Sequence, residues 1–214
     1  MKAMKGYWNH TTLLFKILIL LLMPVMACLV GILFGSPQTV DVVLYTSLAL
    51  VAMLETFTDT WNFGGICNKE FKGSELIKSS VRGRQFYAQV LIADCVRRYG
   101  YFVLITAVIV VASFMQEGSS SLGYLISCIL ICSFTAAGSA MFAIAGSRFF
   151  DNYFGSLMLA YASVIVTAFL MAVLMLLSGF VGCVIAVIYG VAAGLVAVLL
   201  AYKKMERSYY DQTI

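Results

Sequence analysis

Two acids and two polar neighbours recur one helical turn apart in an otherwise apolar part of this sequence. Glu55, Thr58, Asp59 and Asn62 occupy positions i, i+3, i+4 and i+7, so a helix would carry them on one stripe. A carboxylate at membrane depth is costly unless it is paired or hydrated, and it is a candidate functional group by default. The stripe therefore predicts either ion pairs within the protein or a polar lining for a transport path.

Opposite charges for these acids are present in a second polar cluster, which contains Asp94, Arg97 and Arg98. Asp59 falls near the expected membrane interface. We therefore expect it to pair with Arg97, Arg98 or another base on the helix of the third span. We expect Asp94 to join the same network. Glu55 lies one turn deeper in the membrane. Two roles are open for it: a buried tether between helices, or a polar group that lines the translocation path.

The sequence lacks the motifs of common membrane enzymes. It has no G-x-x-x-x-G-K-[ST], no HExxH and a single histidine, His10, which argues against ATP hydrolysis, zinc proteolysis and Ser–His chemistry on this chain. Its six cysteines are scattered without a CxxC, a pattern typical of buried thiols. We expect no catalytic residue, no metal or cofactor bound by this chain, and no nucleic-acid partner.

The elements that position these residues are predicted by composition. The chain has 214 residues, of which 62% are hydrophobic and 11% charged, with a mean hydropathy of +0.97. Apolar runs of about 20 residues match the hydrocarbon thickness of a bilayer. We expect an all-α, polytopic membrane protein in which residues 1–214 form a single transmembrane domain. Its six spans are predicted at about 13–34, 42–61, 99–115, 122–146, 154–177 and 181–202.

The basic residues predict the orientation of these spans. The three short joints 35–41, 116–121 and 178–180 contain none of the fourteen Lys and Arg, which all lie on the other side of the expected membrane. By the positive-inside rule, both termini and the long segment 62–98 are cytoplasmic. The surface available for recognition therefore faces the cytoplasm.

The long cytoplasmic segment reads as a short amphipathic helix over 68–80, a bend at 82–84, and a helix from 85 that continues into the third span. A basic loop of this kind could simply hold anionic lipid headgroups. Its acids and apolar residues favour docking to a protein instead. The predicted docking residues are Glu70, Phe71, Glu75, Leu76, Ile77, Lys78, Ser79, Arg82 and Arg84.

This topology, together with the stretches Asp59–Ile66 (DTWNFGGI), Leu76–Ser80 (LIKSS) and Arg82–Arg84 (RGR), resembles the membrane subunit of ABC-2-type exporters. It is similar to small permeases of Gram-positive bacteria, some of which export amphipathic peptides such as bacteriocins or phenol-soluble modulins. The resemblance covers the whole topology. One difference is the joint 178–180, which is too short for the re-entrant helices that this family usually carries there.

The resemblance implies a permease in a bacterial plasma membrane that moves an apolar or amphipathic substrate. Residues 68–84 would carry the coupling helix that docks into cytoplasmic ABC ATPase subunits, and ATP and Mg would bind to those subunits. A second permease copy or a paralogue would complete the transporter. The alternative is a stand-alone six-helix membrane protein without an ATPase, such as an immunity factor or a small-solute-binding subunit.

Two further patterns concern helix packing. Small residues recur every four positions in the sixth span, and such stripes permit close contact between helices in lipid. We expect the stripe to pack within the chain, with a subunit interface as the less favoured use. Arg148 and Asp151, three positions apart, are expected to form a local ion pair. The stripe consists of Gly182, Ala186, Gly190 and Gly194.

Overall fold

The computed structural model describes residues 8, 11, 13–34, 40–67, 80, 82–114, 122–149, 153–177 and 179–210. Within these ranges the chain is helical and contains no strand, as the all-α prediction requires. The segments 68–79, 115–121 and 150–152 lie outside them. The helices are α2 (Leu13–Ile17), η1 (Leu18–Leu22), α3 (Met23–Phe34), α4 (Val40–Cys67), α6 (Gly83–Phe114), α7 (Leu122–Phe149), α8 (Tyr153–Leu176) and α9 (Gly179–Tyr210).

Five of the described helices are long and apolar enough to cross a membrane, which supports a multi-pass protein but does not confirm the predicted six spans. Their candidate spans are Asp41–Asp59, Gly83–Ala112, Leu122–Arg148, Leu157–Leu176 and Gly179–Glu206. Residues 13–34, expected as the first span, are divided among α2, η1 and α3. The backbone N–H of Met23 bonds to the carbonyl of Leu18, five residues earlier, so a π-helical turn interrupts the α-helix.

Two helices extend beyond the predicted spans: α4 continues to Cys67, and α9 runs through the charged residues after Tyr202 to Tyr210. α6 begins at Gly83, two residues before the start at 85 that was predicted for it, so residues 83 and 84 of the predicted bend are helical. Lys, Met, Glu and Arg are good helix formers, so the loss of hydrophobicity at a membrane interface gives no reason for these helices to stop.

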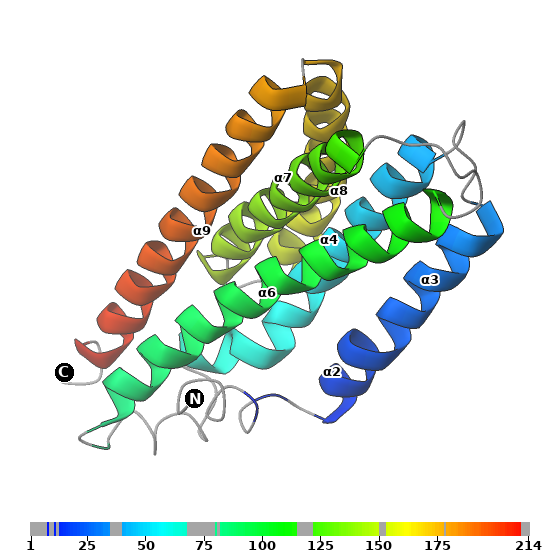
Figure 1. The fold of residues 1–214 in the computed structure, drawn as a ribbon. Helices are drawn as coiled ribbons and strands as arrows, with labels where there is room; N and C mark the ends of the chain where they lie inside the picture. Colours follow the sequence, from blue (N-terminus) through cyan, green and yellow to red (C-terminus); the bar gives the residue numbers. More distant parts are fainter. Residues whose placement is uncertain are drawn as a thin grey trace.

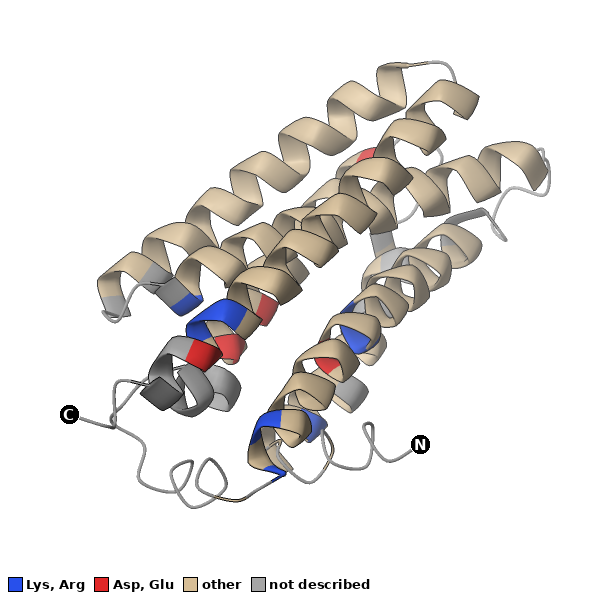
Figure 2. Cartoon of the chain, turned by 90° about the vertical axis from the view of Figure 1, so that its left-hand side faces the viewer, with Lys and Arg blue, Asp and Glu red and all other residues tan. Residues whose placement is uncertain are grey.

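The helices run alternately up and down along one bundle (Figure 1). The start of α2 and the end of α9 therefore lie at the same end, and the described Lys and Arg residues gather towards that end as well (Figure 2). We call it the charged end. The opposite end holds the last turns of α3, α6 and α8 and the first turns of α4, α7 and α9.

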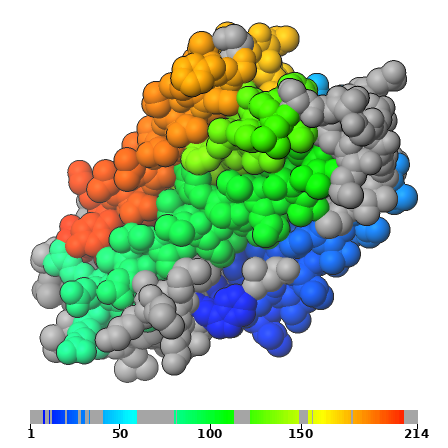
Figure 3. All heavy atoms as spheres, viewed as in Figure 1, coloured from blue at the N-terminus to red at the C-terminus, as the bar shows by residue number. Residues whose placement is uncertain are grey.

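The centre of the bundle is α7, which packs against α4, α6, α8 and α9. In an apolar stretch of 18 residues within its candidate span 78% of the residues are buried, whereas the corresponding stretch of no other candidate span exceeds 44%. Residues 136–140 of α7 (AAGSA) are all small and buried, which lets four neighbours approach one helix. Exposed large apolar side chains instead lie on the outside of the bundle, for example along α9, whose surface is drawn in orange and red in Figure 3.

The small residues of α9 face this central helix and its neighbours. A Cβ atom on Gly190 would lie 2.8 Å from the carbonyl oxygen of Phe134 on α7, and one on Gly182 would lie 2.6 Å from the carbonyl oxygen of Leu174. A Cβ on Gly194 would meet the Tyr99 hydroxyl on α6 at 2.8 Å. Ala186 is fully buried. The stripe is thus occupied by contacts within the chain, which is the use that the sequence favoured.

Candidate functional site

Six charged side chains from three helices meet inside the charged end of the bundle. α4 contributes Glu55 and Asp59, α6 contributes Asp94, Arg97 and Arg98, and the last turn of α7 contributes Arg148. We call these six residues the charge cluster. The i, i+4 spacing on α4 and the i, i+3, i+4 spacing on α6 bring each helix's members onto one face. The packing of α4, α6 and α7 then brings the three faces together.

Arg98 is the centre of the cluster and is fully buried. Its Nε atom donates to Oδ2 of Asp94 over 2.8 Å, one turn back on α6. One terminal nitrogen donates to Oε2 of Glu55 over 2.6 Å, and the other donates to Oδ1 of Asp59 over 2.8 Å. One guanidinium therefore binds all three acids of the cluster, and it joins α6 to two successive turns of α4.

Arg97 adds a second connection between the same helices. Its two terminal nitrogens donate to the two carboxylate oxygens of Glu55, over 2.8 and 2.7 Å. The guanidinium also lies 5.2 Å from the centre of the Phe15 ring and 5.9 Å from that of Tyr101, within cation–π range. Phe15 belongs to α2, so the first described helix is attached to the cluster through this contact.

Arg148 attaches the end of α7. Its Nε and one terminal nitrogen donate to the two carboxylate oxygens of Asp59, over 2.9 and 2.7 Å. The same terminal nitrogen lies 3.3 Å from Oδ2 of Asp94. The Lys204 ammonium of α9 in turn donates to the backbone carbonyl of Arg148, so α9 is tied to the same place.

The charges of the cluster balance, because three carboxylates face three guanidinium groups. Glu55, Asp59, Asp94 and Arg98 are each at most 1% exposed, and bidentate pairs of this type are strong and geometrically specific. A group of ions that is closed on itself has no vacant charge to offer a ligand. The arrangement is therefore suited to holding helices together rather than to binding a solute or transferring a proton.

The structure places the other predicted polar residues as follows. The Thr58 hydroxyl bonds back to the carbonyl of Leu54 over 2.9 Å, which satisfies it within α4. Asn62 lies in α4, but its side chain is outside the described part of the structure, as are the docking residues between 70 and 79. Arg82 and Arg84 are described and exposed at the foot of α6.

Sequence reasoning missed the place of Arg148 in the cluster. Its expected partner, Asp151, lies outside the described residues, and the structure joins Arg148 to acids of α4 and α6 instead of leaving it as a surface charge. A signal was present, because Arg148 is the only Lys or Arg between Arg98 and Lys203. Such an isolated base in apolar sequence needs a buried acid.

Comparisons with protein-family models, curated proteins and solved structures found no match for this chain. In the described residues, no group of three or more His, Cys, Asp or Glu side chains could hold a metal ion.

Proposed function

We propose that this chain is the membrane-embedded permease subunit of an ATP-driven exporter in a bacterial plasma membrane, with ATP hydrolysed by a separate cytoplasmic subunit. The observation that carries the proposal is the form of α6. It is one unbroken helix of 32 residues, about 48 Å long at 1.5 Å per residue, and it exceeds a hydrocarbon core of about 30 Å by roughly 18 Å. Its charged foot can therefore reach a partner in water.

The charge cluster gives this long helix a mechanical role. Arg97 and Arg98 lie about four turns after Gly83, and both side chains bind acids of α4. A force applied to the foot of α6 would therefore be transmitted to α4. Separating buried ion pairs leaves uncompensated charges, at a cost of about 3–5 kcal/mol for each broken pair. The turns of α4, α6 and α7 that carry the charge cluster are therefore expected to move as one unit, so that displacement of the foot tilts the helices instead of bending α6 locally.

The orientation of the bundle supports a cytoplasmic partner. The described bases gather at one end (Figure 2), and this end is cytoplasmic under the positive-inside rule. The segment 68–84 joins α4 to α6 at that end, where a docked ATPase would act on both helices of the cluster. We propose that this segment is the docking site, and that a second copy or a paralogue completes the transporter.

The interior of the bundle fits an apolar or amphipathic substrate. Glu55, which could have lined a transport path, is fully buried and held by Arg97 and Arg98. This geometry favours a buried tether between helices, rather than a lining of the transport path, as the role of Glu55. In the described part of the chain the charge cluster is neutral overall and offers little to a strongly polar solute, whereas an apolar peptide helix would find a matching environment between helices.

The test first looks for a nucleotide-binding domain encoded in an adjacent reading frame, and then co-expresses that ATPase with this chain and co-purifies the two in detergent. Replacing Arg82 and Arg84 with Glu, at the proposed docking site, should abolish co-elution of the ATPase and export of the peptide. The matched control makes the same charge change on α9, with Lys203→Glu and Arg207→Glu, and should retain the complex.

A complex that survives the α6 reversals and an added Leu76→Asp substitution would contradict the coupling. An adjacent reading frame without a nucleotide-binding domain would favour the stand-alone membrane protein.

A further inference from the structure

The outer face of α9 has the length of the hydrocarbon core of a bilayer. Between Phe180 and Leu199, every exposed residue of this helix is apolar. Along the helix axis these two positions are about 29 Å apart at 1.5 Å per residue, which is close to a hydrocarbon thickness of about 30 Å. This face therefore matches the acyl chains of the surrounding lipid in both length and composition.

Lys203 continues the same face beyond the apolar stretch. It follows Leu199 by four positions, as Leu199 follows Leu195, and all three residues are exposed, so they lie one above the other on the helix surface. Four positions advance the helix by about 6 Å. When the apolar face is aligned with the hydrocarbon core, the Lys203 ammonium therefore lies among the lipid headgroups.

The positive charge of Lys203 is not neutralised within the described part of the chain. No described acid forms an ion pair with it, although Glu206 follows three positions later in α9. Glu206 is instead paired with Arg84 of α6, whose guanidinium also lies 6.0 Å from the centre of the Tyr202 ring. Lys203 can therefore bind an anionic group outside the protein.

The adjacent lysine has a different environment. Lys204 is half-buried, and its ammonium donates to the backbone carbonyl of Arg148 at the end of α7. One lysine of this pair is thus held inside the bundle, whereas Lys203 faces the lipid. The two residues carry the same charge at nearly the same depth, so one is a matched control for the other.

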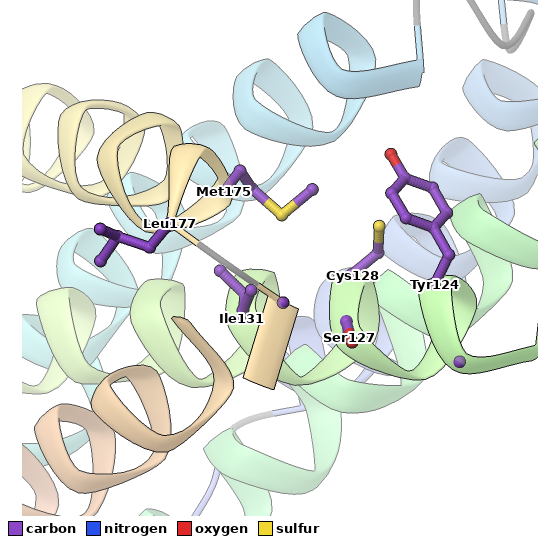
Figure 4. A pocket seen from close by; sticks show the side chains of 8 residues that line it. Tyr124, Ser127, Cys128, Ile131, Met175 and Leu177 are labelled. Carbon is purple, nitrogen blue, oxygen red and sulfur yellow. The ribbon is translucent and has the colours of Figure 1, made fainter. Parts of the chain in front are cut away.

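The opposite end of the bundle offers no comparable charge on this helix. A hollow of about 290 Å³ lies there between the first turns of α7 and the neighbouring ends of α8 and α9 (Figure 4). None of the eight residues that line it is charged, and α9 begins at this end with Gly179 and Phe180. A lipid phosphate in that leaflet would find no basic partner in the first turn of α9.

We propose that the outer face of α9 binds an anionic phospholipid in the leaflet at the charged end, with an acyl chain along Leu195 and Leu199 and the headgroup phosphate against the Lys203 ammonium. The site prefers a lipid with a net negative charge, because the phosphate of phosphatidylcholine is already compensated by its own choline cation. The site is separate from the proposed ATPase docking segment 68–84, so either proposal can fail without the other.

The test titrates the purified chain in an uncharged detergent with palmitoyl-oleoyl phosphatidylglycerol or palmitoyl-oleoyl phosphatidylcholine, and native mass spectrometry measures the bound lipid. The two probes share their acyl chains and differ in the net charge of the headgroup. The unaltered chain should bind phosphatidylglycerol more tightly. Lys203→Gln should raise the apparent dissociation constant of phosphatidylglycerol about fivefold, which is the contribution of one base near an anionic headgroup.

Two further variants separate the position of the charge from its presence. Lys203→Arg keeps the charge in place and should keep the preference for phosphatidylglycerol. Lys204→Gln removes the same charge from the adjacent residue and should leave the dissociation constant nearly unchanged.

Three results would overturn the site. They are equal affinity of the unaltered chain for the two lipids, equal weakening by Lys203→Gln and Lys204→Gln, and displacement of phosphatidylglycerol by an equal concentration of glycerol phosphate. The last result would identify the occupant as a soluble anion, because glycerol phosphate has the headgroup chemistry without the acyl chains.

Discussion

Asp59 on α4 accepts hydrogen bonds from Arg148 on α7 at both of its carboxylate oxygens, over 2.9 and 2.7 Å, although 89 positions separate the two residues. Arg148 lies in the last turn of α7, the most deeply buried span of the bundle. The pair therefore fixes the end of the central helix against α4. Because Arg98 also binds Asp59, the same carboxylate joins α4, α6 and α7.

The first prediction concerns the energetic coupling of Asp59 and Arg148. In a double-mutant cycle with Asp59→Asn and Arg148→Gln, each single substitution should be strongly destabilising, because it leaves the other charge buried. The double variant should lose less than the sum, with a coupling energy of about 0.5–3 kcal/mol. The measurement is thermal unfolding in detergent, which is monitored by the loss of the monodisperse elution peak.

The chain offers a matched control for this cycle. Arg84 and Glu206 also form an ion pair between helices, but their side chains are 49% and 29% exposed. An exposed pair contributes about 0–1 kcal/mol, so Arg84→Gln and Glu206→Gln should be nearly additive and mild. Equal coupling energies for the two pairs would contradict the importance assigned to burial.

The second prediction concerns the centre of the cluster. Arg98→Met keeps most of the side-chain volume but leaves three carboxylates with fewer donors, so the free energy of unfolding should fall by about 3–5 kcal/mol. Arg84→Met, on the same helix but half exposed, should change it by less than about 1 kcal/mol. Similar losses in both variants would show that Arg98 acts only through its aliphatic stem.

The third prediction concerns the close approach of α7 and α9. Gly190→Ala places a Cβ atom 2.8 Å from the backbone carbonyl oxygen of Phe134 on α7. Because α7 is the central helix of the bundle, moving its backbone away from the new Cβ atom would cost free energy. We expect overpacking to destabilise the protein by about 1–3 kcal/mol. Thermal unfolding of the purified variant in detergent measures the change.

Gly100→Ala is the control for this substitution. The new Cβ would meet nothing within 4 Å, and alanine is the better helix former by about 1 kcal/mol. Its unfolding temperature should stay the same or rise. A loss of stability at position 100 equal to that at 190 would show that the effect is not one of packing between helices.

The fourth prediction concerns orientation. If the charged end is cytoplasmic, Lys203→Cys should resist a membrane-impermeant maleimide on intact cells and react after the cells are opened. Phe180→Cys, in the exposed first turn of α9 at the other end, should react on intact cells. The unaltered chain, which has six cysteines, sets the background. The reverse labelling pattern would place the foot of α6 outside the cell and exclude a cytoplasmic ATPase there.

The sequence by itself determined the local structure of this protein. Long apolar runs require helices in a membrane, since each backbone group must find its hydrogen bond within its own segment. The spacing of Glu55 and Asp59 placed both acids on one face, and the bases at 97 and 98 identified α6 as the helix that carries their counter-charges. The stripe ending at Gly194 identified the face of α9 that packs closely.

The tertiary structure decided which of these faces meet, and at what depth. Helical periodicity places a side chain around its own axis, but it does not fix how one helix is rotated or shifted against another. Arg148 therefore looked like a surface residue beside Asp151 until the packing of α7 between α4 and α6 brought it to Asp59.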